Sequence, residues 1–388
     1  ARLPLPTTLV EAANRTVPAL RALRHGDGGL ALFNGSSERD PHLVELVLNR
    51  ASRARVVAAG LPESGFARLS SGRALLIADA AAPAPKGFDH TAHAGMLSFE
   101  FSSGKQRLIV NCGASRQKGW AEALRYPAAH SVLELADMAP MTFEPGGGTS
   151  RPPQVSRTHA TQDGAHWLDM THNGYESQGG GVYHRQLYLG KDGRTLRGEE
   201  KLEGATLARA PCVRFHLHPD IMVEPTENGH LLHSEEESWL FQSDGQVSVE
   251  ESIYLGQGQR TATLQLVLTP PLPQEQTPAA TKPDTAEEHA DPEQPAEAED
   301  TAHTPLPLDS AEADTQAHAP ENTQALPQEV GLLSAGNDQS AGQEAQTAFP
   351  ATPPQPQPAA NGTTGLPYPI IGQPPPKPIH WALSLISE

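Results

Sequence analysis

Histidines are the residues of this 388-residue chain whose type and spacing could do chemistry. His90 and His93 open one stretch, Asn111 closes it, and His130 follows. Imidazole is a common metal ligand and an acid–base group that titrates near neutral pH. Two imidazoles with a carboxylate would be an ordinary zinc set, but Asn111 is a neutral amide. Unrelated histidines at strand ends therefore remain an alternative to a metal site.

The segment 89–113 predicts a β-hairpin that would bring His90 and His93 close to Asn111 and Cys112. Apolar and polar side chains alternate from Met96 to Phe101, Gly104 lies in the turn, and a second apolar run ends at Val110. Antiparallel pairing places the entry of the first strand beside the exit of the second.

A second group of candidates lies further along the chain. His216 and His218 alternate within a strand-like run and would share one face, as a ligand pair or as the lining of a polar groove. Tyr183 and His184 combine an aromatic ring with a polar neighbour, which suits a sugar ring. Ordinary exposed side chains of a sheet would explain these residues equally well.

The repeated short apolar runs from residue 61 to 270 predict an all-β fold, a large antiparallel β-sandwich. The pairs Asp192-Gly193 and Asp244-Gly245 are the best hairpin turns. Residues 1–60 form a lead-in, with helices expected at 7–25 and 41–52 and a strand at 29–34. Pro18 would kink or split the first helix.

The acidity of the chain belongs to its C-terminal part. Residues 271–365 hold 16 acidic side chains and one lysine, a net charge of −15 out of −18 for the whole chain. This Pro- and Ala-rich stretch predicts disorder, and its charge argues against nucleic acid as its partner. Residues 366–388 are apolar again, and a strand or helical turn at 379–386 would act as a tether or dock on the sandwich.

Targeting and redox signals are few. No run of apolar residues is long enough for a membrane span, and no signal peptide is recognisable at Ala1. A start at Ala rather than Met indicates a fragment or a processed chain. Cys112 and Cys212 are expected to be buried free thiols, although one bridge between them is an alternative.

The residues His93 to Gly113, followed by His130 and its neighbours, resemble the heparinase II/III-like polysaccharide lyases. The order and spacing of HAGMLSFEFSSGKQRLIVNCG and AAHSVLEL match a hairpin and loop of that family's C-terminal sandwich. The resemblance covers about 61–268 and implies an α/α toroid upstream, of which 1–60 would be a remnant. It also implies β-elimination at a uronic acid, with a catalytic Tyr on the toroid.

The resemblance also implies roles for particular residues. His93, Asn111 and His130 fall at the three ligands of a structural zinc, with Asn111 in place of an Asp. A cleft histidine would stand at Thr91, so the neighbouring His90 becomes the catalytic candidate. Gly95 replaces a further Asp of the motif.

Two functions follow from these observations. The first is the C-terminal domain of a lyase that acts on acidic polysaccharide and is not active alone. The second is a non-catalytic sandwich that binds glycan or another partner. A basic groove across His216 and His218 would favour the first, because uronate chains are polyanions. The resemblance further implies a cell-envelope or periplasmic location, with a toroid domain or a second copy as partner.

Overall fold

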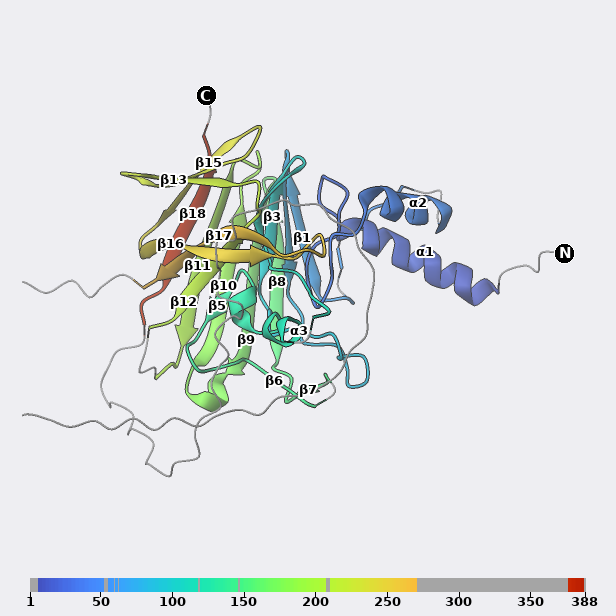
Figure 1. Cartoon of the computed structure of the whole chain (residues 1–388), viewed down its shortest axis with the longest axis horizontal. Coiled ribbons are helices and arrows are strands. Elements are labelled where there is room, and N and C mark those ends of the chain that lie inside the picture. Colours follow the sequence, from blue (N-terminus) through green and yellow to red (C-terminus); the bar gives the residue numbers. More distant parts are fainter. Residues whose placement is uncertain are drawn as a thin grey trace, which may run out of the picture. The chain divides into compact units, whose positions relative to one another are not determined.

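The computed structural model describes residues 6–51, 55–58, 60–61, 63–117, 119–145, 147–206, 210–270 and 376–386. Two antiparallel sheets form the body of the described chain, and two helices lie beside it (Figure 1). The predicted all-β sandwich is confirmed. The predicted disordered stretch 271–365 lies outside the described residues.

The first sheet contains the hairpin that was predicted at 89–113. Its strand order is β1-β2-β3-β4-β12-β17-β16, and β5 also pairs with β12. The strands are β1 (Phe66–Ser71), β2 (Ala74–Asp79), β3 (Phe99–Ser103), β4 (Gln106–Val110), β5 (Leu133–Glu134), β12 (Cys212–Leu217), β16 (Gln246–Tyr254) and β17 (Thr261–Thr269).

The second sheet has the order β13-β14-β15-β18-β11-β10-β9-β8. Its strands are β8 (Val155–Gln162), β9 (Ala165–Tyr175), β10 (Gly181–Leu189), β11 (Thr195–Glu203), β13 (Met222–Thr226), β14 (Gly229–His233), β15 (Ser238–Ser243) and β18 (Ile379–Leu385). The predicted Asp192-Gly193 turn is confirmed between β10 and β11, where Gly193 has φ +71°.

The core lies between the two sheets, where alternate side chains of each strand meet. Phe101 of the first sheet packs edge-on against Trp239 of the second, with ring centroids 5.2 Å apart. Phe215 contacts Phe241 in a tilted arrangement, with ring centroids 5.5 Å apart. Burial of these rings supplies the main driving force for joining the sheets.

The N-terminal lead-in covers the outer face of the first sheet. Helices α1 (Thr7–Ala22) and α2 (Pro41–Ala51) pack on each other through Val17, Val44 and Leu48. The segment after α1 packs Phe33 against Ile77 of β2, so β2 is buried at all six positions. Both faces of this part of the sheet are therefore dry, which explains its continuous apolar sequence.

Three local expectations need correction. Residues 29–34 are not a strand, since only one isolated bridge, between Arg24 and Leu30, forms there. Pro18 lies inside a single helix α1 and does not split it. The Asp244-Gly245 pair is not a hairpin turn, because β15 and β16 belong to different sheets.

The C-terminal strand β18 takes the place beside β15 that the hairpin prediction gave to β16. It pairs antiparallel with β15 on one side and with β11 on the other. Asp244 fixes the start of this strand, accepting a hydrogen bond from the His380 N–H at 2.8 Å. Of the two roles expected for 379–386, docking on the chain's own sandwich is the one observed (β18, red in Figure 1).

Short elements complete the described chain. They are α3 (Trp120–Ala123), the 3₁₀ turns Pro127–Ala129 and Glu176–Gln178, and the small pair β6 (Thr142–Phe143) and β7 (Thr149–Ser150). Cys112 and Cys212 are both free thiols, as expected, but only Cys112 is buried and Cys212 is half-buried. Among the described residues, no helix has the length and apolar character needed to cross a membrane.

Candidate functional site

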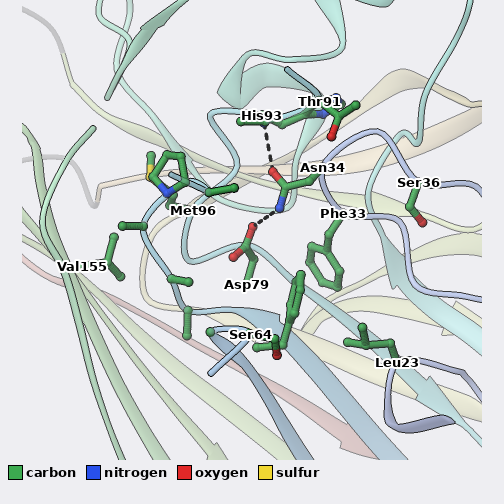
Figure 2. Close-up of a pocket in the computed structure, with 18 of the residues that line it drawn as sticks. Leu23, Phe33, Asn34, Ser36, Ser64, Asp79, Thr91, His93, Met96 and Val155 are labelled. Carbon is green, nitrogen blue, oxygen red and sulfur yellow. Dashed lines mark hydrogen bonds between the residues drawn. The ribbon is translucent and has the colours of Figure 1, made fainter. Parts of the chain in front are cut away.

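A cleft of 810 Å³ opens where the lead-in meets the loops at one end of the first sheet. Its walls come from the lead-in between 20 and 36, from the end of β2 and the loop after it, and from the segment 88–96 (Figure 2). The volume lies within the range of about 300–1,000 Å³ that is usual for small-molecule sites.

A chain of hydrogen bonds crosses the cleft. The backbone N–H of His93 donates to Asn34 Oδ1 at 3.0 Å, and Asn34 Nδ2 donates to Asp79 Oδ2 at 3.0 Å (Figure 2). Asn34 has φ +49°, a left-handed conformation that Asn tolerates better than most residues. One amide side chain thus ties the lead-in to both the sheet and the histidine loop.

Asp79 is a buried titratable residue of the cleft. It ends β2 and is 6% exposed. Burial raises the pKa of its carboxyl to about 7, although hydrogen bonds from Asn34 and from the Ala81 N–H act in the opposite direction. A carboxyl with such a pKa in a cleft can donate or accept a proton near neutral pH, which is typical of functional sites.

Aromatic rings supply the apolar part of the cleft. Phe33 and Phe66 form a tilted pair with centroids 5.3 Å apart. Phe88 also lines the cleft and is 81% exposed, an unusual state for phenylalanine. A cleft that is lined by an exposed ring and by polar groups is suited to a ligand with an apolar face and hydroxyl edges.

The cleft carries little positive charge. Among the described lining residues, Arg157 is the one arginine and no lysine is present. Its guanidinium donates to the carbonyl oxygens of Phe66 at 3.0 Å and Leu61 at 3.3 Å. Glu63 and Asp79 also line the cleft. The described lining therefore does not form a positively charged groove.

His93 and His130, two of the three positions that the resemblance assigns to a zinc site, lie next to each other. Their Nδ1 and Nε2 atoms lie 3.3 Å apart and both rings are buried. Burial lowers the pKa of His93 well below its ordinary value and lowers that of His130 to about 4, so both are neutral at pH 7. Gly95 makes room for this pair, because a Cβ there would lie 2.6 Å from the His130 ring.

The donors around these histidines do not fit a zinc ion. No group of three or more His, Cys, Asp or Glu side chains that could hold a metal occurs within the described ranges. Asn111 Oδ1 already accepts a hydrogen bond from the Ser131 N–H at 2.9 Å. The nearby Glu100 accepts one from the Asn111 N–H at 3.0 Å and one from His25 at 2.9 Å. Two neutral imidazoles without an anionic ligand are a poor zinc set, and the zinc that the resemblance implies stays a prediction.

Thr91 and its neighbour His90 differ in their relation to the cleft. Thr91 lines the cleft, whereas His90, also exposed, is not among the lining residues. The role expected for His90 stays a prediction, without a contact that would support it.

His216 and His218 do not form an exposed basic groove. His216 is buried, contacts Ser252 Oγ at 2.7 Å and the Ala128 carbonyl oxygen at 3.0 Å, and has its pKa lowered by burial to about 3. His218 is 8% exposed and lies 3.3 Å from the Asp220 carboxylate. The condition set for a polyanion-binding face is therefore not met.

Tyr183 and His184 are separated by the sheet. Tyr183 is fully buried between the sheets, where its hydroxyl donates to Glu200 at 2.5 Å. His184 points to the outer face, where its Nε2 lies 3.1 Å from the Glu203 carboxylate. Their predicted role in substrate binding is not tested directly, but these two side chains do not share a surface.

Sequence reasoning missed Asp79, Asn34 and Phe88. An acidic residue at the end of the apolar run ALLIAD was a usable signal for Asp79, and Asn34-Gly35 suggested a turn. The exposure of Phe88 had no signal in the sequence, because it depends on loops that meet only in the folded chain.

The described chain is thus an antiparallel β-sandwich with a cleft at the loop end of one sheet. Residues 55–294 match the family described as heparinase II/III-like, C-terminal. The chain belongs to this family, as the resemblance in the hairpin indicated.

The chain is also similar to proteins with different recorded roles. FtsZ-localized protein C of Caulobacter vibrioides is 30% identical over 253 residues, which cover 58% of this chain and 42% of that protein. A mutant of the heparan sulfate lyase HepC from Pedobacter heparinus has 14% identity and a TM-score of 0.53 over 69% of this chain and 45% of the lyase. A heparinase III gene product has 12% identity and a TM-score of 0.51 over 68% and 44%.

The chain spans less than half the length of each of these relatives. The two lyase structures share its fold, at identities too low to transfer an activity.

Proposed function

We propose that this chain is a heparinase II/III-like sandwich that binds a saccharide in the Asp79 cleft without cleaving it. The observation that carries the proposal is the cleft itself, in which the exposed ring of Phe88 accompanies the polar row of Asp79, Asn34 and His93. Aromatic rings and directed hydrogen-bonding groups are the two elements that sugar recognition needs.

The lining argues for binding rather than elimination. Elimination at a uronic acid needs a base, an acid and a group that neutralises the carboxylate. Asp79 could serve as one proton-transfer group, but Arg157 is occupied by carbonyl oxygens and His93 is buried and neutral. Asp79, Arg157 and His93 therefore do not make a complete eliminating site by themselves, which agrees with a sandwich that binds a saccharide without cleaving it.

The charge of the lining also bears on the ligand. Acidic polysaccharide is the substrate class that the family resemblance suggests, yet the described lining holds two carboxyl groups, Glu63 and Asp79, against one cation, Arg157, and so offers little attraction to a polyanion. A neutral or amino-sugar oligosaccharide fits this lining better. Heparin, alginate and chitohexaose together cover the acidic and the uncharged possibilities.

Titration calorimetry of the full chain with these three glycans tests the proposal. We expect chitohexaose to bind more tightly than heparin or alginate, and Phe88→Ala to weaken binding about tenfold. Met222→Ala is a matched control, because Met222 is an exposed apolar residue, 70% accessible, that does not line the cleft. Equal binding by the Phe88 variant and the control would contradict the assignment of the cleft.

A second candidate function rests on the sequence relative rather than on the cleft. The relative that is 30% identical is named for its localisation with FtsZ. A role at the site of FtsZ assembly would agree with a sandwich that binds without degrading. Pelleting of the full chain with FtsZ polymers tests this, and a chain that stays in the supernatant at every polymer concentration would contradict it.

A further inference from the structure

The outer face of the second sheet carries a cross-strand row of ring and guanidinium groups far from the histidine pair in sequence. Trp167 of β9 lies directly opposite Tyr188 of β10, and Tyr188 lies opposite Arg197 of β11. The Trp167 and Tyr188 ring centroids are 4.4 Å apart. The Arg197 guanidinium lies 5.9 Å from the Tyr188 ring centroid. Register and ring contact thus place three flat groups side by side.

This row faces solvent. Along β9, Leu168 and Met170 are buried in the core, so the alternating Trp167 and Asp169 point outward. Trp167 is 49% exposed, whereas Trp239 and Trp381 are buried. The half-exposed indole thus presents a flat apolar surface to solvent beside the Tyr188 ring.

A second outward row runs parallel to the first, two residues along each strand. Its members are Asp169 of β9, Gln186 of β10 and Glu199 of β11, which are matched by the same register. Two residues along a strand is about 6.6 Å, and neighbouring strands are about 4.8 Å apart. A pyranose ring lying on the aromatic row would therefore have amide and carboxylate oxygens beside its hydroxyl edge.

The surroundings distinguish a saccharide from a protein partner. On β8, β9, β10 and β11, Trp167 is the one large apolar residue that is exposed among the described residues. A protein interface of useful affinity has a contiguous apolar centre, which this face does not have. One or two open rings with polar neighbours is instead the chemistry of a sugar platform.

We propose that Trp167, Tyr188 and Arg197, with Asp169 and Gln186, form a second saccharide-binding site on the outer face of this sheet. Trp167 stacks on the apolar face of a neutral pyranose, Tyr188 supports the indole from the side, and Gln186 and Asp169 receive the hydroxyl groups. Charges of both signs flank the rings, so the site takes an uncharged glycan chain in preference to a polyanion. Trp167 does not line the cleft, so this second site can be tested independently of the cleft.

The test is binding of cellohexaose and chitohexaose to the full chain by titration calorimetry, with Trp167→Ala and Trp167→Phe. We expect at least one of the two glycans to bind, Trp167→Ala to weaken that binding about tenfold, and Trp167→Phe to keep it within about threefold. The surface position makes loss of folding an unlikely source of the effect, and an unchanged unfolding midpoint would confirm this. The Phe88→Ala variant, which affects only the cleft, should retain this component of the binding.

A second readout does not depend on affinity. Bound glycan should protect Trp167 from oxidation by N-bromosuccinimide, as read by peptide mass spectrometry, and Trp120 should show no such protection. Equal binding by wild type and Trp167→Ala, or oxidation of Trp167 that saturating glycan does not slow, would overturn the proposal. Loss of binding in Trp167→Ala alone, with Phe88→Ala unaffected, would support this site and refute the cleft.

Discussion

The Trp381 indole N–H donates a hydrogen bond of 2.9 Å to Glu200 Oε1 in the centre of the sandwich. Glu200 is also paired with Arg185 through contacts of 2.9 and 3.0 Å, and all three side chains are buried. Trp381 belongs to the C-terminal strand, and its ring stacks on Phe99 at 5.7 Å. The end of the chain therefore completes a buried polar network that the rest of the sandwich leaves open.

Removing this ring should destabilise the whole sandwich. Trp381→Ala deletes a buried indole and takes one donor from a buried carboxylate, which together should cost about 3–5 kcal/mol of unfolding free energy. Trp381→Phe keeps most of the stacking and should cost less, about 1–3 kcal/mol. Urea unfolding followed by circular dichroism measures both. Two variants as stable as wild type would show that β18 does not occupy this place in solution.

The raised pKa of Asp79 predicts a stability that depends on pH. Since the folded chain holds the Asp79 proton up to about pH 7 while an unfolded Asp loses it near 3.8, stability present at low pH is lost as the pH rises through this window. Asn at this position does not titrate. The stability of Asp79→Asn relative to wild type should therefore improve by up to about 4 kcal/mol between about pH 4 and about pH 8.

Chemical unfolding at several pH values gives this difference directly. Asp169→Asn is the matched control, because Asp169 is exposed on an outer face. A difference between Asp79→Asn and wild type that does not change with pH would mean that Asp79 is not buried as described.

The lowered pKa of His216 predicts that stability depends on pH in the opposite direction. Its pKa is lowered to about 3 by burial and by the neighbouring Arg214 and His130. The unfolded chain takes up this proton near pH 6.5, so stability is lost as the pH falls from about 6.5 towards 3. His216→Gln should remove part of this loss, and its unfolding free energy should fall less steeply with acid than that of wild type. Parallel acid profiles for the two proteins would contradict the buried, neutral state of His216.

Metal analysis tests the histidine pair. Two imidazoles and the Asn111 amide should not retain zinc, so mass spectrometry of the full chain after equilibration with zinc and gel filtration should find about 0.1 equivalents or fewer. The double variant His93→Ala, His130→Ala should give the same content. One equivalent in wild type that is lost in the double variant would establish the zinc site implied by the resemblance.

The hairpin and the β-class of the fold were predictable because their signals are local. Alternation from Met96 to Phe101 and the turn at Gly104 reach only a few residues, and the structure places β3 and β4 there. The partner of β15 was not predictable in this way. Trp381 meets Glu200 across 181 positions, and the 109 residues numbered 270–378 separate β18 from β17. The Asp244-Gly245 pair looked like a hairpin turn because that partner lies so far away in sequence.

The candidate site was predictable only in part for the same reason. The contact between His93 and His130 agrees with the motif of the family resemblance, whereas the hairpin alone did not place His130. The pKa of Asp79 is raised by burial and lowered by the hydrogen bond from Asn34, 45 positions earlier. Neither influence can be predicted from the apolar run ALLIAD that contains Asp79. His216 and His218 alternate in the sequence, as two residues lining a groove on one sheet face would. His216 is nevertheless buried, and its ring contacts Ser252 and Ala128, which are distant in sequence.

Binding without cleavage is the central claim, and one experiment that follows binding and cleavage together tests it most directly. The full chain is incubated with chitohexaose, heparin and alginate in separate samples, while calorimetry follows binding and absorbance follows the unsaturated uronate that elimination creates. We expect a binding isotherm with chitohexaose that Phe88→Ala weakens, and no rise in uronate absorbance with heparin or alginate. A rise in absorbance that Asp79→Asn abolishes would contradict the claim and identify the chain as an eliminating lyase.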